Sequence, residues 1–264
     1  MSLEKTEVVM LKAFNWSESS RTVHFFSREF GRLPLVDRAG RKLTSKRGRL
    51  LPFARMEVTF YGSKKGTAGY VSDVELLETF SLDAEGTLGR LGYGSAACEL
   101  LFLLLPEDQA QNVLYTYFVS FLRQVSRSDK RTLPALFIAF FLRLMSQLGY
   151  APSIAYCSGC NREFTEFADE NKYVLFSPER GGLVCRTCQK AGEYYIRLSV
   201  EGARLMVALQ KASLDEAALL PIRYEDATVL IGALAKFLKY HSGLVSDIKS
   251  LRFLDKLKNS QTGS

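Results

Sequence analysis

Histidine and tryptophan are almost absent from this chain of 264 residues, which holds two histidines and one tryptophan. Neither His24 nor His241 has a sequence partner that indicates a nucleophile or a metal triad. Residues 62–67 lack the Gly-Lys-Ser/Thr order of a Walker loop, and Gly92–Ala97 matches a dinucleotide-binding pattern without a β-branched strand before it. The sequence therefore indicates no ATPase and no clear catalytic arrangement.

Long hydrophobic runs are missing as well. The first ten residues carry Glu4, Lys5 and Glu7 and have no apolar stretch of the kind that a secretion signal needs. The longest apolar run, Leu133–Leu142, has ten residues and stops at Arg143, whereas a membrane span needs about 20. We expect a soluble cytoplasmic protein with no membrane partner.

What is present is an ordinary globular composition with an uneven charge. Hydrophobic residues make up 47% of the chain and charged residues 24%. Residues 21–65 hold 12 basic and 3 acidic side chains, residues 66–235 hold 15 and 20, and residues 236–264 hold 6 and 2. Such a segregated positive field attracts a polyanion, although a charge excess is also found on surfaces that are merely well solvated.

The first 80 residues have the pattern of short β-strands. Five runs are predicted as strands: Glu7–Phe14, Arg21–Ser27, Gly31–Asp37, Ala54–Phe60 and Thr67–Val74. In Ala54–Phe60 the apolar side chains fall on every second residue, as in a strand with one buried face. Five short strands suit a small closed barrel of the OB type, because closure leaves no exposed edges.

After Ser81 the pattern becomes helical. Four helices are predicted at Ala96–Leu105, Asp108–Val125, Lys130–Leu148 and Val200–Lys211, and a fifth contains Leu230, Leu234, Phe237 and Leu238 on one face. Ser128 and Asp129 are expected to cap the third helix and Ser199 the fourth. The inward face of the second helix is predicted to carry Val113, Leu114, Tyr117 and Phe121.

Four of the five cysteines stand in two Cys-x2-Cys pairs. Cys157 and Cys160 are followed after 24 residues by Cys185 and Cys188. Four thiolates suit one tetrahedral Zn²⁺, and they leave no open position for a catalytic water, so the metal is structural. A hairpin from Tyr173–Phe176 back through Gly181–Gly182 would close the gap. Disulfides are the alternative, and Cys98 is interpreted as a small core residue.

The most basic segment is residues 38–49, in which the six cations Arg38, Arg41, Lys42, Lys46, Arg47 and Arg49 stand between small residues. Its composition favours a loop that contacts phosphates and not bases. Flexible loops that bind no ligand can have the same composition. Trp16 falls in the first predicted strand-to-strand loop, where it either stacks on a base or plugs the mouth of the barrel.

Taken together, the chain resembles the RecO family of bacterial recombination mediators over nearly its full length. The resemblance lies in short stretches that occur in the family's order: Ser17-Glu18, Gly31, Gly40-Arg41-Lys42 with Ser45, Leu51-Pro52-Phe53, Leu148-Gly149-Tyr150-Ala151-Pro152, Phe176-Ser177-Pro178, Gly181 to Cys185, and Lys249-Ser250-Leu251-Arg252-Phe253-Leu254. It implies a non-enzymatic protein that binds single- and double-stranded DNA, anneals complementary strands and assists RecA loading.

The resemblance also implies partners and sites. The implied partners are RecR, the acidic C-terminal tail of single-strand-binding protein and, indirectly, RecA; Lys236, Lys239 and Arg252 are compatible with binding of that tail. The implied DNA-binding residues in the barrel are Arg41, Lys42, Lys46, Arg47, Arg49, Arg38, Arg21, Lys64 and Lys65. Two other functions remain open for this chain. One is that of an RNA-binding protein of the translation or transcription machinery with an OB barrel and a zinc ribbon, and the other is that of a pure interaction scaffold that binds no nucleic acid.

We therefore predict a multidomain α+β protein in which an OB-type five-stranded barrel precedes an α-helical domain with an inserted four-cysteine zinc module. The predicted boundaries are 1–80 for the barrel, 81–152 and 194–258 for the helical domain, 153–193 for the zinc insertion and 259–264 for a flexible tail.

Overall fold

The structure is a computed structural model that describes residues 2–15, 17–18, 20–38, 50–62, 69–82, 88–170, 172–244, 247–252 and 254. The chain forms two compact units, Met1–Ser126 and Arg127–Ser264, which are described separately below. The domain boundaries expected at residues 80, 152, 193 and 258 stay predictions.

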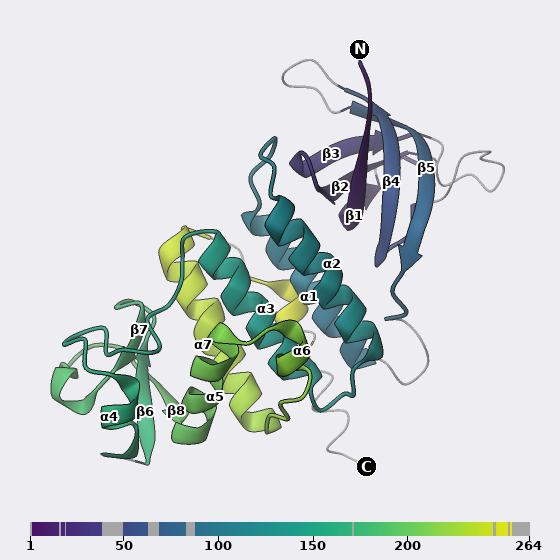
Figure 1. Cartoon of the computed structure of the whole chain (residues 1–264). Helices are drawn as coiled ribbons and strands as arrows, with labels where there is room; N and C mark the ends of the chain where they lie inside the picture. The colour runs from purple at the N-terminus through teal and green to yellow at the C-terminus, as the bar shows by residue number, and fades with distance from the viewer. Residues whose placement is uncertain are drawn as a thin grey trace. The chain divides into compact units, whose positions relative to one another are not determined.

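The first unit contains a closed five-stranded barrel (Figure 1). Its strands are β1 (Leu3–Asn15), β2 (Arg21–Ser27), β3 (Gly31–Asp37), β4 (Ala54–Tyr61) and β5 (Gly69–Thr79). They pair around the barrel in the order β1-β2-β3-β5-β4, and β4 closes it by pairing with β1. All pairs are antiparallel except β3 with β5. The predicted OB-type barrel is confirmed.

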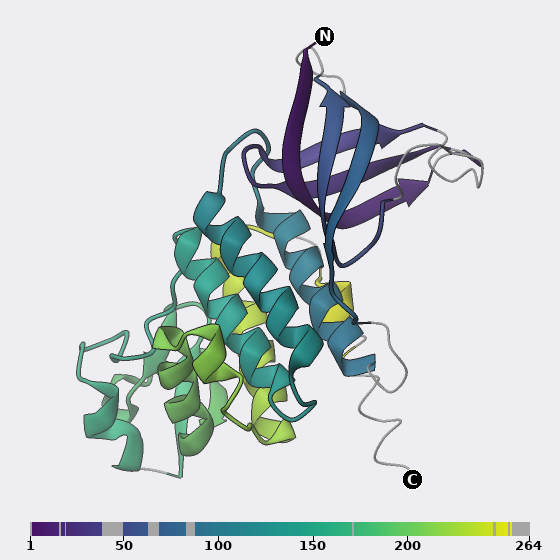
Figure 2. The same cartoon turned by 45° about the vertical axis from the view of Figure 1, so that its right-hand side comes forward.

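Alternating side chains build the barrel core. In β3 and β4 every second residue is buried, and the core gathers Val23, Phe25, Leu35, Met56 and Val58 from neighbouring strands. Strand β1 is longer than predicted because its first half pairs with β4 and its second half with β2, with a bulge between Met10 and Lys12. It is the long dark purple strand in Figure 2.

Two helices, α1 (Leu88–Leu104) and α2 (Asn112–Arg127), complete the first unit. On α2, Tyr115 and Phe118 pack against Phe26 of β2, with ring centroids 5.4 and 6.1 Å apart. The prediction that Leu114 and Phe121 face inward is confirmed, whereas the prediction for Val113 is wrong, since its side chain is 71% exposed. The buried face of α2 is the one on which Tyr115 and Phe118 contact Phe26, and Val113 lies outside it.

The second unit contains a helical core of α3 (Leu133–Gln147), α5 (Val200–Lys211), α6 (Leu214–Ala217) and α7 (Tyr224–Ser242). The hydroxyl of Ser199 accepts a hydrogen bond from the Gly202 N–H at 2.9 Å, so the predicted cap of α5 is confirmed. The predicted cap of α3 is wrong. The Asp129 carboxylate instead accepts from the Arg131 N–H within a turn, and α3 begins only at Leu133, with Pro134 in its first turn.

The segment between α3 and α5 forms a small module. It comprises α4 (Phe164–Phe167), a 3-10 turn at Ala168–Glu170, β6 (Tyr173–Ser177), β7 (Gly182–Val184), a second 3-10 turn at Arg186–Cys188, and β8 (Ile196–Ser199). Its sheet has the order β7-β6-β8, and the predicted β6–β7 hairpin is confirmed by the pair Ser177 and Gly182. Within the described residues, no helix is long and apolar enough to cross a bilayer.

Candidate metal centre and nucleic-acid interface

The hairpin brings the two Cys-x2-Cys pairs together. Cys157 and Cys160 belong to a turn closed by the Asn161 N–H, which donates to the Cys157 carbonyl at 2.9 Å. Cys185 directly follows β7, and Cys188 ends the 3-10 turn that begins at Arg186. All four sulfur atoms lie within 4.8 Å of one another, so residues 25 or more positions apart form one cluster.

The spacing of the sulfur atoms fits a metal ion rather than disulfides. All five cysteines are free, and the Sγ atoms of Cys160 and Cys185 are 3.7 Å apart. A disulfide would require about 2.05 Å. Zinc–sulfur bonds of about 2.3 Å in a tetrahedron place neighbouring sulfurs about 3.8 Å apart, which agrees with this distance.

Two glycines make room for the cluster. A Cβ atom at Gly159 would lie 2.8 Å from the Cys188 Cβ and 2.9 Å from its sulfur. At Gly182, where β7 begins, a Cβ atom would lie 2.0 Å from the Ser153 carbonyl oxygen. The Cys157–Cys160 turn therefore approaches Cys188, and Ser153 approaches β7, more closely than residues with side chains at these two positions would permit.

Local hydrogen bonds favour thiolates at this position. The sulfur of Cys157 accepts the N–H groups of Gly159 and Cys185 at 3.4 and 3.3 Å. Burial raises the pKa of the Cys185 thiol, but hydrogen bonds from Thr187 and the other cysteines outweigh burial and bring this pKa to about 6. The pKa of Cys188 rises to about 12, first through burial and then because its neighbours compete for one proton. Because a metal ion binds thiolates, its binding at this cluster would displace the thiol protons that remain.

Arg180 supports the cluster from outside. Its guanidinium donates to the Cys188 carbonyl at 2.8 Å and to the Glu193 carboxylate at 2.7 Å. The Tyr195 hydroxyl donates to the same carboxylate at 2.6 Å. These two hydrogen bonds, and then the positive charge of Arg180, hold the pKa of Glu193 below its usual value. This network fixes the second Cys-x2-Cys pair against the hairpin.

The four cysteines thus fit a metal ion of the tetrahedral thiolate type, with Cys157, Cys160, Cys185 and Cys188 as the residues that would hold it. When bound, such an ion links parts of the chain that are distant in sequence. Cys98 lies elsewhere, in α1, and burial raises its pKa to about 12, as expected of a core thiol.

The second candidate site is one end of the barrel. Arg21, the first residue of β2, pairs in register with Asp37, the last residue of β3, and Val36 pairs with Tyr70 near the start of β5. Strand β2 therefore begins, β3 ends and β5 begins at this end of the barrel. We call this end, defined by Arg21, Asp37, Arg38 and Tyr70, the basic rim.

Two of the predicted DNA-binding residues lie at the basic rim in the described structure. The Arg21 guanidinium donates to the Asp37 carboxylate at 2.9 Å, and Asp37 is only 1% exposed, so Arg21 neutralises a buried charge. The Arg38 guanidinium lies 3.7 Å from the centroid of the Tyr70 ring. Trp16, Arg41, Lys42, Lys46, Arg47, Arg49, Lys64 and Lys65 lie outside the described residues.

Three supporting residues were not found from the sequence. Asp37 resembles any strand-end carboxylate, and Tyr70 meets Arg38 only because β3 and β5 pair in parallel. Arg180 precedes two glycines in the hairpin, a context that hints at a turn and not at a hydrogen bond to Cys188. No pattern in a single sequence shows such contacts.

Comparison with known proteins assigns the chain to a family. Residues 1–80 match the family profile described as "Recombination protein O N terminal", and residues 85–252 match "Recombination protein O C terminal". The chain is 30% identical to "DNA repair protein RecO" of Symbiobacterium thermophilum over 264 residues, which cover 99% of this chain and 100% of the relative. It is also 30% identical to the protein of that name from Pelotomaculum thermopropionicum over 267 residues, covering 100% and 98% of the two chains. The chain therefore belongs to the RecO family of DNA repair proteins.

Proposed function

We propose that this chain is a non-enzymatic recombination mediator that binds single- and double-stranded DNA and anneals complementary strands. In the same proposal it assists RecA loading in the bacterial cytoplasm, together with RecR and the C-terminal tail of single-strand-binding protein. Family membership supports this function over the RNA-binding alternative and over a pure interaction scaffold. The cluster of Cys157, Cys160, Cys185 and Cys188 would hold one structural Zn²⁺ ion.

The observation that carries the proposal is the position of the basic rim. Eight of the nine cations proposed to bind DNA belong to the segments 38–49 and 62–68, which in the sequence follow the end of β3 and precede the start of β5 at this rim. Cations that neutralise phosphates on two strands lower the repulsion between those strands, and pairing can then proceed without any bond being made or broken.

The two described cations contribute differently to this mechanism. Since Arg21 already pairs with buried Asp37, we assign it a smaller share in DNA binding and a larger one in holding β2 to β3. Arg38 lies on the ring of Tyr70 and presents its charge where the 38–49 segment leaves β3. The main electrostatic contribution is then assigned to Arg41, Lys42, Lys46, Arg47 and Arg49.

The test replaces Arg41, Lys42, Lys46 and Arg47 together with alanine and measures oligonucleotide binding as a function of salt. The slope of log affinity against log salt should decrease by about 0.7 for each lost single-strand phosphate contact. A matched variant that replaces the exposed cations Arg127, Lys130, Arg131 and Lys211 changes the net charge equally and should keep the slope. Equal slopes for the two variants would contradict the assignment to the basic rim.

A further inference from the structure

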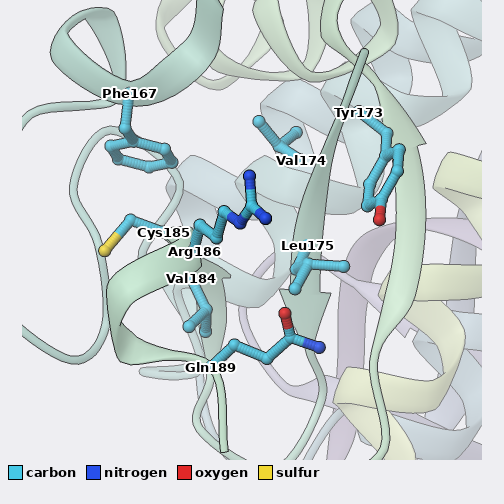
Figure 3. Close-up of a pocket in the computed structure, with 8 residues that line it drawn as sticks. All are labelled: Phe167, Tyr173, Val174, Leu175, Val184, Cys185, Arg186 and Gln189. Atoms are coloured by element: carbon cyan, nitrogen blue, oxygen red, sulfur yellow. The ribbon is translucent and has the colours of Figure 1, made fainter. Parts of the chain in front are cut away.

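The small module between α3 and α5 has a pocket of about 230 Å³, lined by residues of α4, β6, β7 and the second 3-10 turn (Figure 3). Its floor is formed by Val174, Leu175 and Val184, which are at most 7% exposed. The groups that a ligand can reach are therefore mainly those at the rim: the Tyr173 ring, the Arg186 guanidinium and the Gln189 amide, all on exposed residues.

The arrangement at the rim suits a flat, polar ligand. Figure 3 shows Tyr173 and Phe167 on opposite sides of the pocket, with the Arg186 guanidinium between them and the Gln189 amide below. Rings and guanidinium planes stack on nucleobases, and an amide both donates to and accepts from a base edge. The pocket is smaller than the roughly 300–1,000 Å³ of sites for drug-sized ligands, so it suits a single ring system.

The charge around the pocket is positive. Lys172 precedes Tyr173, Lys190 follows Gln189, and Arg197 pairs in register with Leu175, its guanidinium 4.8 Å from the centroid of the Tyr173 ring. All three are exposed, and none forms an ion pair within the residues that the structure describes. Asp169 on the neighbouring turn is neutralised by Arg204 at 2.5 Å. This cationic surface contrasts with the net acidic composition of residues 66–235.

We propose that this pocket binds one unstacked base of single-stranded DNA, whose flanking phosphates contact Lys172, Lys190 and Arg197. The proposal rests on the proposed DNA-binding function and adds a second contact, separate from the basic rim. An acidic peptide with an apolar side chain fits less well for two reasons. That side chain would make no hydrogen bond with the Gln189 amide, and it would contact little of Val174, Leu175 and Val184, because these residues are buried. A duplex does not fit, because its bases are stacked and paired.

The test uses the full-length, metal-loaded chain and an oligothymidine that carries one 2-aminopurine, whose fluorescence reports stacking. Tyr173→Leu should weaken binding to this single strand by about fivefold or more and leave duplex binding unchanged. Tyr173→Phe keeps the ring and should bind as the unchanged chain does. Tyr194→Leu removes another exposed tyrosine of the module, outside the pocket, and should have no effect.

The charge of the site is tested by Arg197→Ala, which should lower the salt slope for the single strand by about 0.7, whereas the exposed control Lys211→Ala should not. The pocket proposal is wrong if Tyr173→Leu binds the single strand normally, or if it loses single strand and duplex equally. It is also wrong if that variant loses only the binding of a labelled acidic peptide with an apolar end. If only the variant that lacks Arg41, Lys42, Lys46 and Arg47 loses affinity, the proposed function stands without the pocket. Absence of all DNA binding by the unchanged chain would refute both.

Discussion

Replacement of Cys185 by serine should release the metal and unfold residues 153–193 while the barrel stays folded. Cys185 is buried, and its sulfur lies 3.7 Å from that of Cys160, in the centre of the cluster. Its backbone N–H also donates to the sulfur of Cys157. The substitution therefore removes one ligand and disturbs the link between the two Cys-x2-Cys pairs.

The expected loss is large compared with ordinary protein stability. A structural zinc ion contributes on the order of 10–16 kcal/mol to the folding of its site. Whole domains are stable by only about 5–15 kcal/mol. Segments of about 40 residues rarely form a sufficient core of their own, and this one relies on a three-stranded sheet and a few buried rings such as Phe164 and Phe176. Without the ion, the module should lose its fold.

Metal analysis and native-state hydrogen exchange resolved by peptide measure this outcome. The unchanged chain should hold one metal ion and protect β6 and β7, whereas Cys185→Ser should hold none and exchange freely there. In the control Cys98→Ala, a buried thiol outside the cluster is lost, so metal content should stay and stability should fall by about 1 kcal/mol. A Cys185→Ser protein with one bound ion, or with full protection of β6, would refute the reasoning.

Further predictions concern the first unit. Phe118→Ala should cost about 3–5 kcal/mol in urea unfolding, because its ring packs on Phe26, whereas Val113→Ala should change stability by less than about 0.5 kcal/mol. The pKa of His24 is lowered, mainly by burial and then by Arg32, so the folded chain resists its protonation; stability should therefore decrease as the pH falls through about 6.5, and His24→Phe should flatten this dependence. If Trp16 stacks on a base, oligothymidine should quench the tryptophan fluorescence; unchanged emission would favour the interpretation that Trp16 plugs the barrel.

The barrel was predictable because its strands alternate, and the errors in element length have physical causes. Strand β5 extends to Thr79 because it pairs with β4 along the whole length of β4, across two shifts in register. Residues 75–79 do not alternate between apolar and polar, so their sequence does not predict this extension. Helix α1 begins at Leu88, eight residues earlier than predicted, and runs through three glycines. A Cβ atom at Gly94 would lie 2.5 Å from Leu82, so close packing outweighs the low helix propensity of glycine there.

The candidate sites were predictable to different degrees. Cysteine spacing located all four residues of the metal cluster, because few other chemistries need two such pairs. The basic segment was located by charge density, but the use of Arg21 to neutralise Asp37 follows from strand register, which composition does not give. The pocket beside Tyr173 was missed altogether, since it joins the end of α4, two strands and a 3-10 turn.

The two proposed DNA contacts depend on different forces, and this difference makes them separable. The barrel is held by a closed sheet around an apolar core that contains Phe25, Met56 and Val58. The pocket is lined by Cys185 and by Arg186, so its shape depends on the metal cluster. A chelator should therefore abolish the 2-aminopurine signal while the salt-dependent binding assigned to the basic rim persists. The contrary outcome is that the 2-aminopurine signal and the salt-dependent binding are lost together, at a chelator concentration at which the barrel is still protected from hydrogen exchange. DNA binding would then lie in the second unit, and the basic rim would be only a solvated surface.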